Sequence, residues 1–470
     1  MKNNDMRITV DAAERFQTVS GFGTSACWWA QNISDCETRS QIARLLFSRD
    51  GLGLNIFRYN VGGGVNPEHN RVKTPWRNTE SFYFFNEKTQ KWEYDFTRDA
   101  NAQAFLFEAL SYGCVDNVVL FANSPHYSMT ITGEASGSAE GNYTTNLSRE
   151  HYRDFVDYFL TVTEYFLGRG VPVKYISPIN EPQWKWGGEV RQEGCHFEPD
   201  EALELIELFA KGIEERGLPV KLSAPESGEI SELTKEYFVR MYENETIKRS
   251  LGSFAYHCYW SDDNAEAKKE LGDWYALSEF SHIPLEMTEW CELPCRHGQT
   301  VPEASAIMAR VMTNDFNFSG VNSWTSWVAV NITYIGEDGL DYADGMISTS
   351  EDFSVWNKGR RYYAMAHFSR FVPSGSVMIA SHADSIPFIK DEEGRVRYKT
   401  NFCAFLTLEN KTVLVISNED EEKAIELNCG GNQAEIFITD ETHLLEKVFS
   451  GEKPEKITLS KNSVATVVIS

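Results

Sequence analysis

The feature that most constrains this chain is a strand-like apolar segment that recurs along the first 330 residues, with helical segments between its recurrences. The recurrences cover residues 18–29, 53–61, 117–129, 173–184, 220–226, 253–260, 284–290 and 320–330. Strands that alternate with helices pair in parallel, and eight such units close into a barrel. The sequence therefore predicts an α/β fold, a (β/α)8 TIM barrel, whose functional side chains lie at the ends of the strands.

Two of the intervening helices can be placed from their apolar spacing. The first carries Tyr152, Phe155, Val156, Phe159, Val162 and Phe166 on one face. It is expected to end at Gly168 and Gly170, because glycine is common just beyond a helix C-terminus. The second is expected from about Asp200 to Glu215, before Gly217.

After Gly375 the pattern changes to short alternating segments, which cover residues 403–408, 412–417, 434–438 and 463–469. Turn residues separate them, as in an antiparallel β-sandwich. Residues 6–10 alternate in the same way and are expected to add a strand to that sandwich. We therefore predict an N-terminal strand in residues 1–15, a barrel in residues 16–372 and a β-sandwich in residues 373–470.

The charge of the chain excludes several classes of partner. With 69 acidic and 44 basic residues the net charge is −25, which repels a phosphate backbone. Nucleic acid and anionic membrane are therefore not expected as partners. No apolar run is long enough to span a bilayer, and the first ten residues lack the apolar core of an export signal.

The nine cysteines are an odd number without a regular framework, which favours reduced thiols. We accordingly expect a cytoplasmic protein, or a secreted one if an export signal has been removed. Cys291, Cys295 and His297 lie close in sequence, but no second closely spaced pair completes a zinc set. Neither a metal nor another cofactor is expected.

Two glutamates follow strand-like segments. Glu181 stands in Asn180-Glu-Pro182 directly after an apolar run, and Glu289 ends the run from Pro284. A single glutamate at a strand end is usually solvated or paired in a salt bridge. Two of them at the same end of a barrel suit the acid-base and nucleophilic cleavage of a glycosidic bond.

Seven short motifs carry a resemblance to a known family. In order they are Ser20-Gly-Phe-Gly23 with Trp28-Trp29, Arg58-Tyr-Asn-Val-Gly-Gly-Gly64, Asn123-Ser-Pro125, Asn180-Glu-Pro-Gln-Trp184, Gln192-Glu-Gly-Cys195, Met287-Thr-Glu-Trp290 and Trp324-Thr-Ser-Trp327. Together they resemble glycoside hydrolase family 30 of the large (β/α)8 clan, and most closely its endo- and exo-β-1,6-galactanase branch. The chain departs from that pattern at His126-Tyr-Ser-Met129, where aromatic or bulkier residues are expected.

The resemblance implies roles for the two glutamates. Glu181 corresponds to the general acid/base and Glu289 to the nucleophile of a retaining enzyme, which forms a covalent glycosyl-enzyme and keeps its carboxyl groups roughly 5 Å apart. Burial and the charge of its partner should raise the pKa of Glu181, while Glu289 stays ionised.

The resemblance also implies residues that bind the substrate or hold the nucleophile. Asn180 would hydrogen-bond the sugar 2-hydroxyl, and Arg58 would keep the nucleophile ionised, although it could equally be a structural salt bridge. Tyr259 could donate to Glu289, whereas His257 could be an ordinary buried histidine.

Aromatic and acidic residues near the strand ends are further candidates. Trp29 and Trp327 are expected as platforms for the sugar, and Trp324 as a core residue. Glu193 could grip a sugar hydroxyl, although a loop glutamate is more often solvated. Glu226 has the same ambiguity and is the weaker candidate.

The expected function is a retaining glycoside hydrolase that cleaves β-1,6-linked galactan or galacto-oligosaccharides. The alternatives are a related β-glucosidase, β-xylosidase or β-glucuronidase, and a catalytically inactive carbohydrate-binding scaffold. In each case the partner is a β-linked oligo- or polysaccharide. The sequence does not indicate an oligomeric state.

Overall fold

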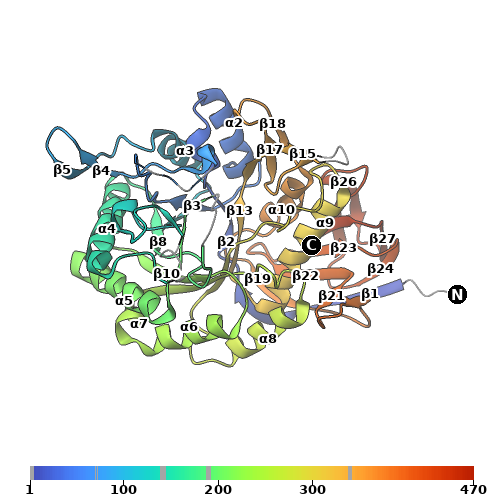
Figure 1. Cartoon of the computed structure of the whole chain (residues 1–470). Helices are drawn as coiled ribbons and strands as arrows, with labels where there is room; N and C mark the ends of the chain where they lie inside the picture. Colours follow the sequence, from blue (N-terminus) through green and yellow to red (C-terminus); the bar gives the residue numbers. More distant parts are fainter. Residues whose placement is uncertain are drawn as a thin grey trace.

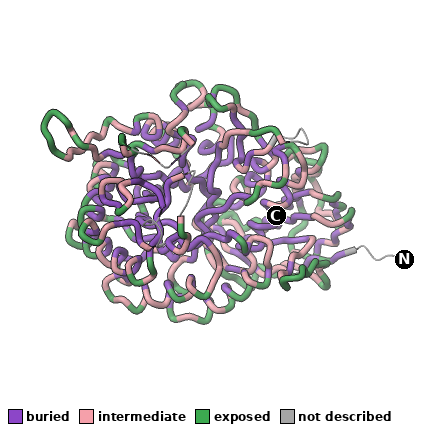
Figure 2. Tube along the Cα trace, in the orientation of Figure 1, coloured by how far each residue is buried: buried purple, intermediate pink, exposed green. Residues whose placement is uncertain are grey.

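The structure is a computed structural model that describes residues 5–68, 70, 72, 74–137, 144–186, 192–336 and 341–470. Figure 1 shows two bodies packed side by side, a barrel ringed by helices and a sheet formed mainly by the C-terminal part of the chain. Buried residues fill the middle of both, and exposed residues lie on the outer loops and helix faces (Figure 2).

Eight parallel strands close into the predicted barrel, in the order β10-β11-β12-β13-β2-β3-β6-β8. The strands are β2 (Gly21–Ser25), β3 (Ile56–Asn60), β6 (Asn117–Phe121), β8 (Val173–Ser177), β10 (Lys221–Ser227), β11 (Leu251–His257), β12 (Leu285–Glu289) and β13 (Ser323–Val328). Each overlaps one of the eight segments expected from the sequence. The prediction of a (β/α)8 barrel is thus confirmed.

Helices cover the outside of the barrel. They are α1 (Trp29–Asn32), α2 (Cys36–Phe47), α3 (Ala100–Ser111), α4 (Tyr152–Gly168), α5 (Pro199–Arg216), α6 (Glu232–Glu243), α7 (Glu245–Ser250), α8 (Ala265–Ala276), α9 (Pro302–Asn314) and α10 (Arg360–Ser369). The two helices expected from apolar spacing are α4 and α5, and Phe155 and Phe159 of α4 pack edge-on against Phe209 of α5. Gly217 ends α5 in the left-handed conformation, with φ 62°.

Short elements stand in the loops that follow the barrel strands. Hairpins are formed by β4 (Tyr83–Asn86) with β5 (Lys91–Tyr94) and by β15 (Tyr334–Ile335) with β16 (Asp341–Tyr342). The others are β7 (Ser136–Gly137), β9 (Gly194–Cys195), β14 (Val330–Ile332), β17 (Ile347–Thr349), β18 (Trp356–Lys358), η1 (Pro75–Arg77), η2 (Tyr127–Met129) and η3 (Arg149–His151). A further short helix, η4 (Asp315–Ser319), continues α9 before β13.

The C-terminal strands form a nine-stranded sheet, in the order β26-β25-β28-β23-β22-β19-β1-β24-β27. They are β1 (Asp5–Thr18), β19 (Val377–Ala383), β22 (Thr400–Leu406), β23 (Thr412–Asn418), β24 (Lys423–Asn428), β25 (Gln433–Thr439), β26 (Glu446–Glu452), β27 (Lys456–Leu459) and β28 (Ser463–Ile469); β20 (Phe388–Lys390) and β21 (Val396–Tyr398) form a separate hairpin. The N-terminal strand joins this sheet as predicted, antiparallel to β19 but parallel to β24.

The sheet has its own apolar core and a second face on the barrel helices. Ile8, Ile379, Leu414 and Ile425 belong to one buried cluster inside the sheet, while Phe405 of the same sheet packs into the main core of the barrel. Strand β1 ends at Thr18 and β19 begins at Val377, so the chain passes between the sheet and the barrel near the expected boundaries. The boundaries after residues 15 and 372 stay a prediction.

No helix in the part of the chain that the structure describes is both long and apolar enough to cross a membrane.

Candidate active site

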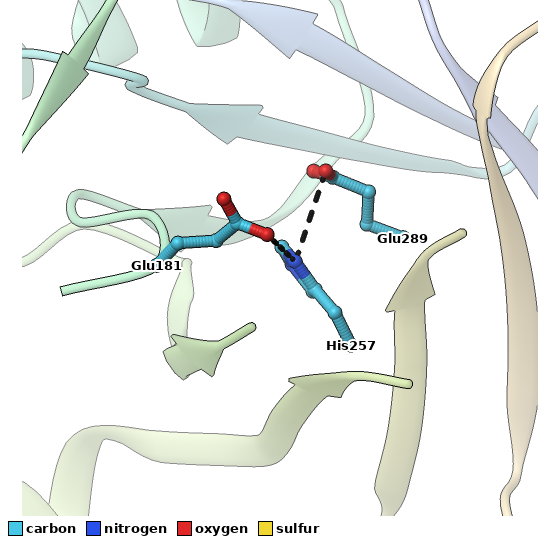
Figure 3. Close-up of side chains that lie close together, drawn as sticks. All are labelled: Glu181, His257 and Glu289. Atoms are coloured by element: carbon cyan, nitrogen blue, oxygen red, sulfur yellow. Dashed lines mark hydrogen bonds and ion pairs between the residues drawn. The ribbon is translucent and has the colours of Figure 1, made fainter. Parts of the chain in front are cut away.

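Glu181, His257 and Glu289 point toward one another at the C-terminal ends of the barrel strands (Figure 3). His257 and Glu289 are the last residues of β11 and β12, and Glu181 lies in the loop after β8 with a left-handed φ of 47°. One oxygen of each carboxylate and a ring nitrogen of His257 all lie within 4.8 Å of one another. This spacing suits two carboxylates that act in turn on one anomeric carbon.

The two glutamates open into a cavity of about 590 Å³. Its lining is rich in indole rings and comprises Trp28, Trp76, Arg77, Glu181, Trp184, Lys185, Trp186, Gln192, Tyr259, Trp260, Glu289, Cys291, Leu293, Trp327, Val328, Asn331 and Asp344. Indole faces beside carboxylates suit a ring that has an apolar face and hydroxyl groups at its edge, as a sugar has.

Glu289 is buried and held by two donors. Arg58 Nη1 donates to its Oε2 at 3.1 Å, and the Tyr259 hydroxyl donates to its Oε1 at 3.2 Å. Burial raises the pKa of Glu289 to about 7, and the negative charge of Glu181 adds to the rise, whereas His257 and Arg58 oppose it.

The sequence led us to expect that Glu289 stays ionised. Burial opposes this by raising its pKa to about 7. Arg58 and Tyr259 both donate to its carboxylate and stabilise the ionised form. The site thus supplies donors for the form of Glu289 that attack on an anomeric carbon requires.

Arg58 connects the functional groups of several strands. Its fully buried guanidinium donates to Glu289, to the Asn180 side-chain oxygen at 3.2 Å and to Ser25 Oγ at 2.8 Å. It also forms an ion pair with Glu226 at 3.3 Å. Asn180 is thus fixed by Arg58, and the two readings of Arg58, as structural salt bridge and as partner of the nucleophile, are compatible.

His257 is buried between carboxylates. Its Nδ1 lies 3.0 Å from Glu181 Oε1 and its Nε2 lies 3.0 Å from Glu226 Oε2. Burial lowers the pKa of His257, but the charges and hydrogen bonds of Glu289, Glu181 and Glu226 outweigh it and raise the pKa to about 10. The imidazolium form donates from both nitrogens, so His257 is more than an ordinary buried histidine.

Glu226, the weaker candidate from the sequence, contacts both Arg58 and His257. It is fully buried near the C-terminal end of β10 and has a φ of 59°. Its carboxylate accepts hydrogen bonds from Ser177 Oγ at 2.8 Å and from Thr288 Oγ1. Burial alone would raise the pKa of Glu226, but Arg58 and His257 lower it to about 2. The signal for it was its place at a strand end, which it shares with many residues.

The expected contact of Trp29 with sugar needs correction. Trp29 is fully buried, donates from its indole nitrogen to Ser25 O at 3.0 Å and packs edge-on against Phe105 at 4.7 Å. The neighbouring Trp28 lines the cavity instead, and its ring meets Trp327 at 5.2 Å. Trp327 lines the cavity, as expected of a platform.

Glu193 is neither solvated nor directed at the cavity. It is buried and accepts hydrogen bonds from Asn60 Nδ2 at 2.8 Å, Gly63 N at 2.9 Å and Thr79 Oγ1 at 3.1 Å. Burial raises the pKa of Glu193 to about 7. Its role is to hold the glycine turn after β3, where a Cβ on Gly63 would lie 2.7 Å from Pro125 O.

The cavity also uses residues that the sequence did not single out. Trp76 and Arg77 come from the loop after β3, and the Arg77 guanidinium lies 4.9 Å from the ring centres of both Trp28 and Trp76. Trp324 is buried and donates from its indole nitrogen to Asp315 at 2.9 Å, in keeping with the core position expected for it.

Glu181, His257 and Glu289 are also a cluster whose geometry could hold a metal ion. Both ring nitrogens of His257 are engaged by carboxylates, and Arg58 brings a second positive charge to Glu289. A divalent cation would have to displace these contacts, so the residues fit proton transfer better than metal binding. That no metal is needed stays a prediction.

Comparison with known proteins agrees with this geometry. The sequence profile of O-Glycosyl hydrolase family 30 matches residues 5–244. The chain is 22% identical over 405 residues to the endo-beta-1,6-galactanase of Hypocrea rufa, covering 80% of this chain and 77% of that protein. It is 22% identical over 397 residues to the endo-1,6-beta-D-glucanase of Neurospora crassa, covering 80% and 75%.

A solved structure shares the whole architecture. The conserved exported protein from Bacteroides fragilis superposes with a TM-score of 0.81 at 25% sequence identity, covering 98% of this chain and 100% of that chain. The resemblance therefore extends over the barrel and the C-terminal sheet together.

Proposed function

This chain belongs to O-glycosyl hydrolase family 30 and is a glycoside hydrolase, and on that premise we propose that it cleaves β-1,6-linked galactan or galacto-oligosaccharides with retention of configuration. The observation that carries the proposal is the approach of Glu181 and Glu289 within 4.8 Å, at the end of a barrel and in an indole-lined cavity. Carboxyl groups this close leave no room for a water between them and the sugar, which favours the retaining mechanism over the inverting one.

The reaction has two displacements. In the first, Glu289 attacks the anomeric carbon while Glu181 gives its proton to the departing glycosidic oxygen, so that a covalent glycosyl-enzyme forms. In the second, Glu181 takes a proton from water, whose oxygen attacks the same carbon and releases Glu289. Arg58 and Tyr259 hold Glu289 in place through both steps.

The contacts of Glu181 suit this exchange of protons. Its Oε1 meets Nδ1 of His257, which stays protonated because Glu226 faces the other ring nitrogen. The imidazolium stabilises the carboxylate left after Glu181 has given up its proton. Asn180, oriented by Arg58, is proposed to contact the 2-hydroxyl of the sugar.

The linkage is proposed from the relatives. The Hypocrea rufa and Neurospora crassa proteins are an endo-beta-1,6-galactanase and an endo-1,6-beta-D-glucanase, so both names specify a β-1,6 linkage. Because the two identities are equal, β-1,6-glucan is the second candidate. β-Xylosidase and β-glucuronidase activities rest only on the shared catalytic pair.

A panel of purified β-glycosides, three disaccharides and one aryl glycoside, tests the proposal. β-1,6-Galactobiose, β-1,6-glucobiose, xylobiose and an aryl β-glucuronide are each incubated with the protein, and the anomer first released is followed by NMR. We expect β-1,6-galactobiose to be cleaved fastest, with the β-anomer released first. Cleavage of another member of the panel alone would reassign the sugar. An initial excess of the α-anomer over the equilibrium mixture that the reducing-end sugar contributes would exclude retention.

The sequence had also left open an inactive carbohydrate-binding scaffold. Two glutamates held by Arg58, Tyr259 and His257 argue against it, because binding alone does not need a buried, charged pair. A 2-deoxy-2-fluoro glycoside with a good leaving group should label Glu289 covalently, as detected by peptide mass spectrometry.

A chelator should leave turnover unchanged, since protonation and attack are both assigned to side chains.

The compartment is also a proposal. All nine cysteines are free thiols and five of them are buried, which favours a reducing compartment, although the Bacteroides fragilis relative is described as exported. A cytoplasmic enzyme would meet short oligosaccharides rather than polymer. We therefore expect β-1,6-galactobiose and -triose to be cut faster per bond than arabinogalactan, and the opposite order would favour an extracellular enzyme.

A further inference from the structure

Five of the six indole rings of the cavity fall into two groups on opposite sides of Glu289, and the sixth, Trp186, donates from its indole nitrogen to Glu181 O at 3.4 Å. Trp28, Trp76 and Trp327 follow or belong to β2, β3 and β13, and Trp28 contacts both of the others edge-on at 6.2 and 5.2 Å. Trp184 and Trp260 follow β8 and β11 and meet each other edge-on at 6.3 Å. In the closed barrel, β12 separates the second arc of strands from the first.

The second group is tied to the proposed acid/base. The Trp184 amide donates to Glu181 O at 3.1 Å. A Cβ built on Gly228 would lie 2.2 Å from the Trp184 indole nitrogen and 3.1 Å from Glu181 Oε1, so the indole and the carboxyl group flank the same point. The first group is tied to the nucleophile strand, because Trp327 N donates at 2.8 Å to the carbonyl of Trp290, the residue after Glu289.

Trp260 has a conformation that packing within the protein does not explain. Its φ is 62°, in the left-handed region that costs a non-glycine residue about 1 kcal/mol or more. Its side chain is 56% exposed, so burial offsets little of that cost. A large apolar ring that is held strained and exposed at a cavity mouth indicates contact with a ligand.

We infer that Trp184 and Trp260 bind the sugar on the leaving-group side of the scissile bond. The inference rests on the proposed function, since it needs Glu181 to be the group that protonates the leaving oxygen. The sugar attached to that oxygen must then lie on the Glu181 side of the cavity, against the indoles that adjoin Glu181. Trp28, Trp76 and Trp327 are left to bind the sugar that is transferred to Glu289.

A comparison of two substrates with the same transferred sugar tests this assignment. The leaving group is fluoride in a β-glycosyl fluoride and a hexose in the β-1,6-disaccharide. Both substrates carry a galactosyl group, or both a glucosyl group, according to which sugar the unaltered protein cleaves. Fluoride does not extend to Trp260, whereas a hexose can stack on it. The readout is the ratio of kcat/KM for the disaccharide to kcat/KM for the fluoride.

Trp260→Ala should lower this ratio roughly tenfold, the effect of no longer burying about 60 Å² of apolar sugar surface. Trp76→Ala, on the other arc, should lower both rates together and keep the ratio. Phe388→Ala is the matched control, because Phe388 is 57% exposed and lies on a hairpin of the C-terminal region.

A second readout uses acceptors. When a hexose or disaccharide is added to the glycosyl-enzyme, it must bind on the leaving-group side before it can replace water. Trp260→Ala should therefore lower the fraction of transglycosylation product, measured at fixed acceptor concentration. The assignment would be overturned if Trp260→Ala left both the ratio and the product fraction unchanged. It would also be overturned if the ratio fell in Trp76→Ala instead. Failure of the unaltered protein to cleave either substrate pair would refute the proposed function itself.

Discussion

At the scale of single residues, the charges around Glu181 and Glu289 decide what the site can do. Glu181, Glu226 and Glu289 supply three carboxyl groups, and Arg58 and His257 supply two cations, all of them buried. Such a set is stable only if each charge has partners, and each of the two cations contacts at least two of the carboxylates. The removal of one member should therefore change the pKa of its neighbours.

The two glutamates should respond differently to loss of the side chain. Glu181→Ala should retain glycosylation by an aryl glycoside with a good leaving group, because such a group leaves without protonation. Azide should then restore turnover by at least roughly tenfold and give a β-glycosyl azide. Glu289→Ala should lose roughly 10⁴-fold or more in kcat and, if azide rescues it, give the α-glycosyl azide. The opposite pattern of azide products, read by NMR, would reverse the two assignments.

Glu226→Gln should lower the pKa of His257. Glu226 helps to raise that pKa to about 10, and its neutral replacement no longer stabilises the imidazolium by charge. The measurement is a pH titration of the His257 ring by NMR. Ser177→Ala is the control, because it removes a hydrogen bond to Glu226 but keeps the charge. The pKa of His257 should fall less in this variant, and an equal fall in both would mean that the charge of Glu226 is not the cause.

At the scale of single elements, β12 carries two carboxylates with different surroundings. Glu289 stands at the end of the strand among donors. Glu286 is buried, and its Oε1 has no hydrogen-bond partner among the residues that the structure describes. Burial raises the pKa of Glu286 to about 7, although Ser253 and Lys174 partly oppose it. The folded protein thus binds this proton more tightly than the unfolded chain does.

The pH dependence of stability follows from that difference. The contribution of Glu286 is fully present below pH 4.5 and is lost as the pH rises to about 7. The glutamine in Glu286→Gln cannot ionise. The difference in free energy of unfolding, variant minus unaltered protein, should therefore be about 1–3 kcal/mol larger at pH 8 than at pH 4. Urea unfolding at both pH values measures this, with the exposed Glu87→Gln as control. An equal effect at pH 4 and pH 8 would contradict the titration of Glu286.

At the scale of the whole molecule, the chain begins in the sheet where it ends. Figure 1 shows β1, in blue, beside the orange and red C-terminal strands, and β1 pairs with both β19 and β24. The barrel follows β1 directly, and α9 and α10 pack on the same sheet through contacts such as Ser417 Oγ with Ala306 O at 2.8 Å. The two bodies should therefore unfold together.

Ile8 and Arg7 are adjacent on β1 and test this coupling. Ile8 is fully buried in the core of the sheet, so Ile8→Ala should cost about 2–4 kcal/mol. Arg7 faces solvent and pairs with Glu426, and Arg7→Ala should cost measurably less. In Ile8→Ala, tryptophan fluorescence, which reports the barrel, should change at the same urea concentration as far-UV circular dichroism. Separate transitions would mean that the two bodies unfold independently.

The sequence by itself determined which segments form strands and helices. Apolar side chains repeat every two residues in a strand and every 3.6 residues in a helix, and the repeat indicates both the element and its buried face. The eight barrel strands, the helices α4 and α5 and the entry of the N-terminal strand into the C-terminal sheet could all be predicted in this way. The places of Glu181 and Glu289 at the strand ends followed from the same pattern and from the motifs around them.

Only the tertiary structure decided where individual side chains at and beyond the strand ends point. Trp28 and Trp29 are neighbours of the same type, yet Trp28 lines the cavity and Trp29 is locked by Ser25 and Phe105. Glu193 and Glu226 turn inward because donors from distant segments, such as Asn60 and His257, meet them there. Loops after different strands have no common period, so their contacts are set by the closed barrel that brings the strand ends together.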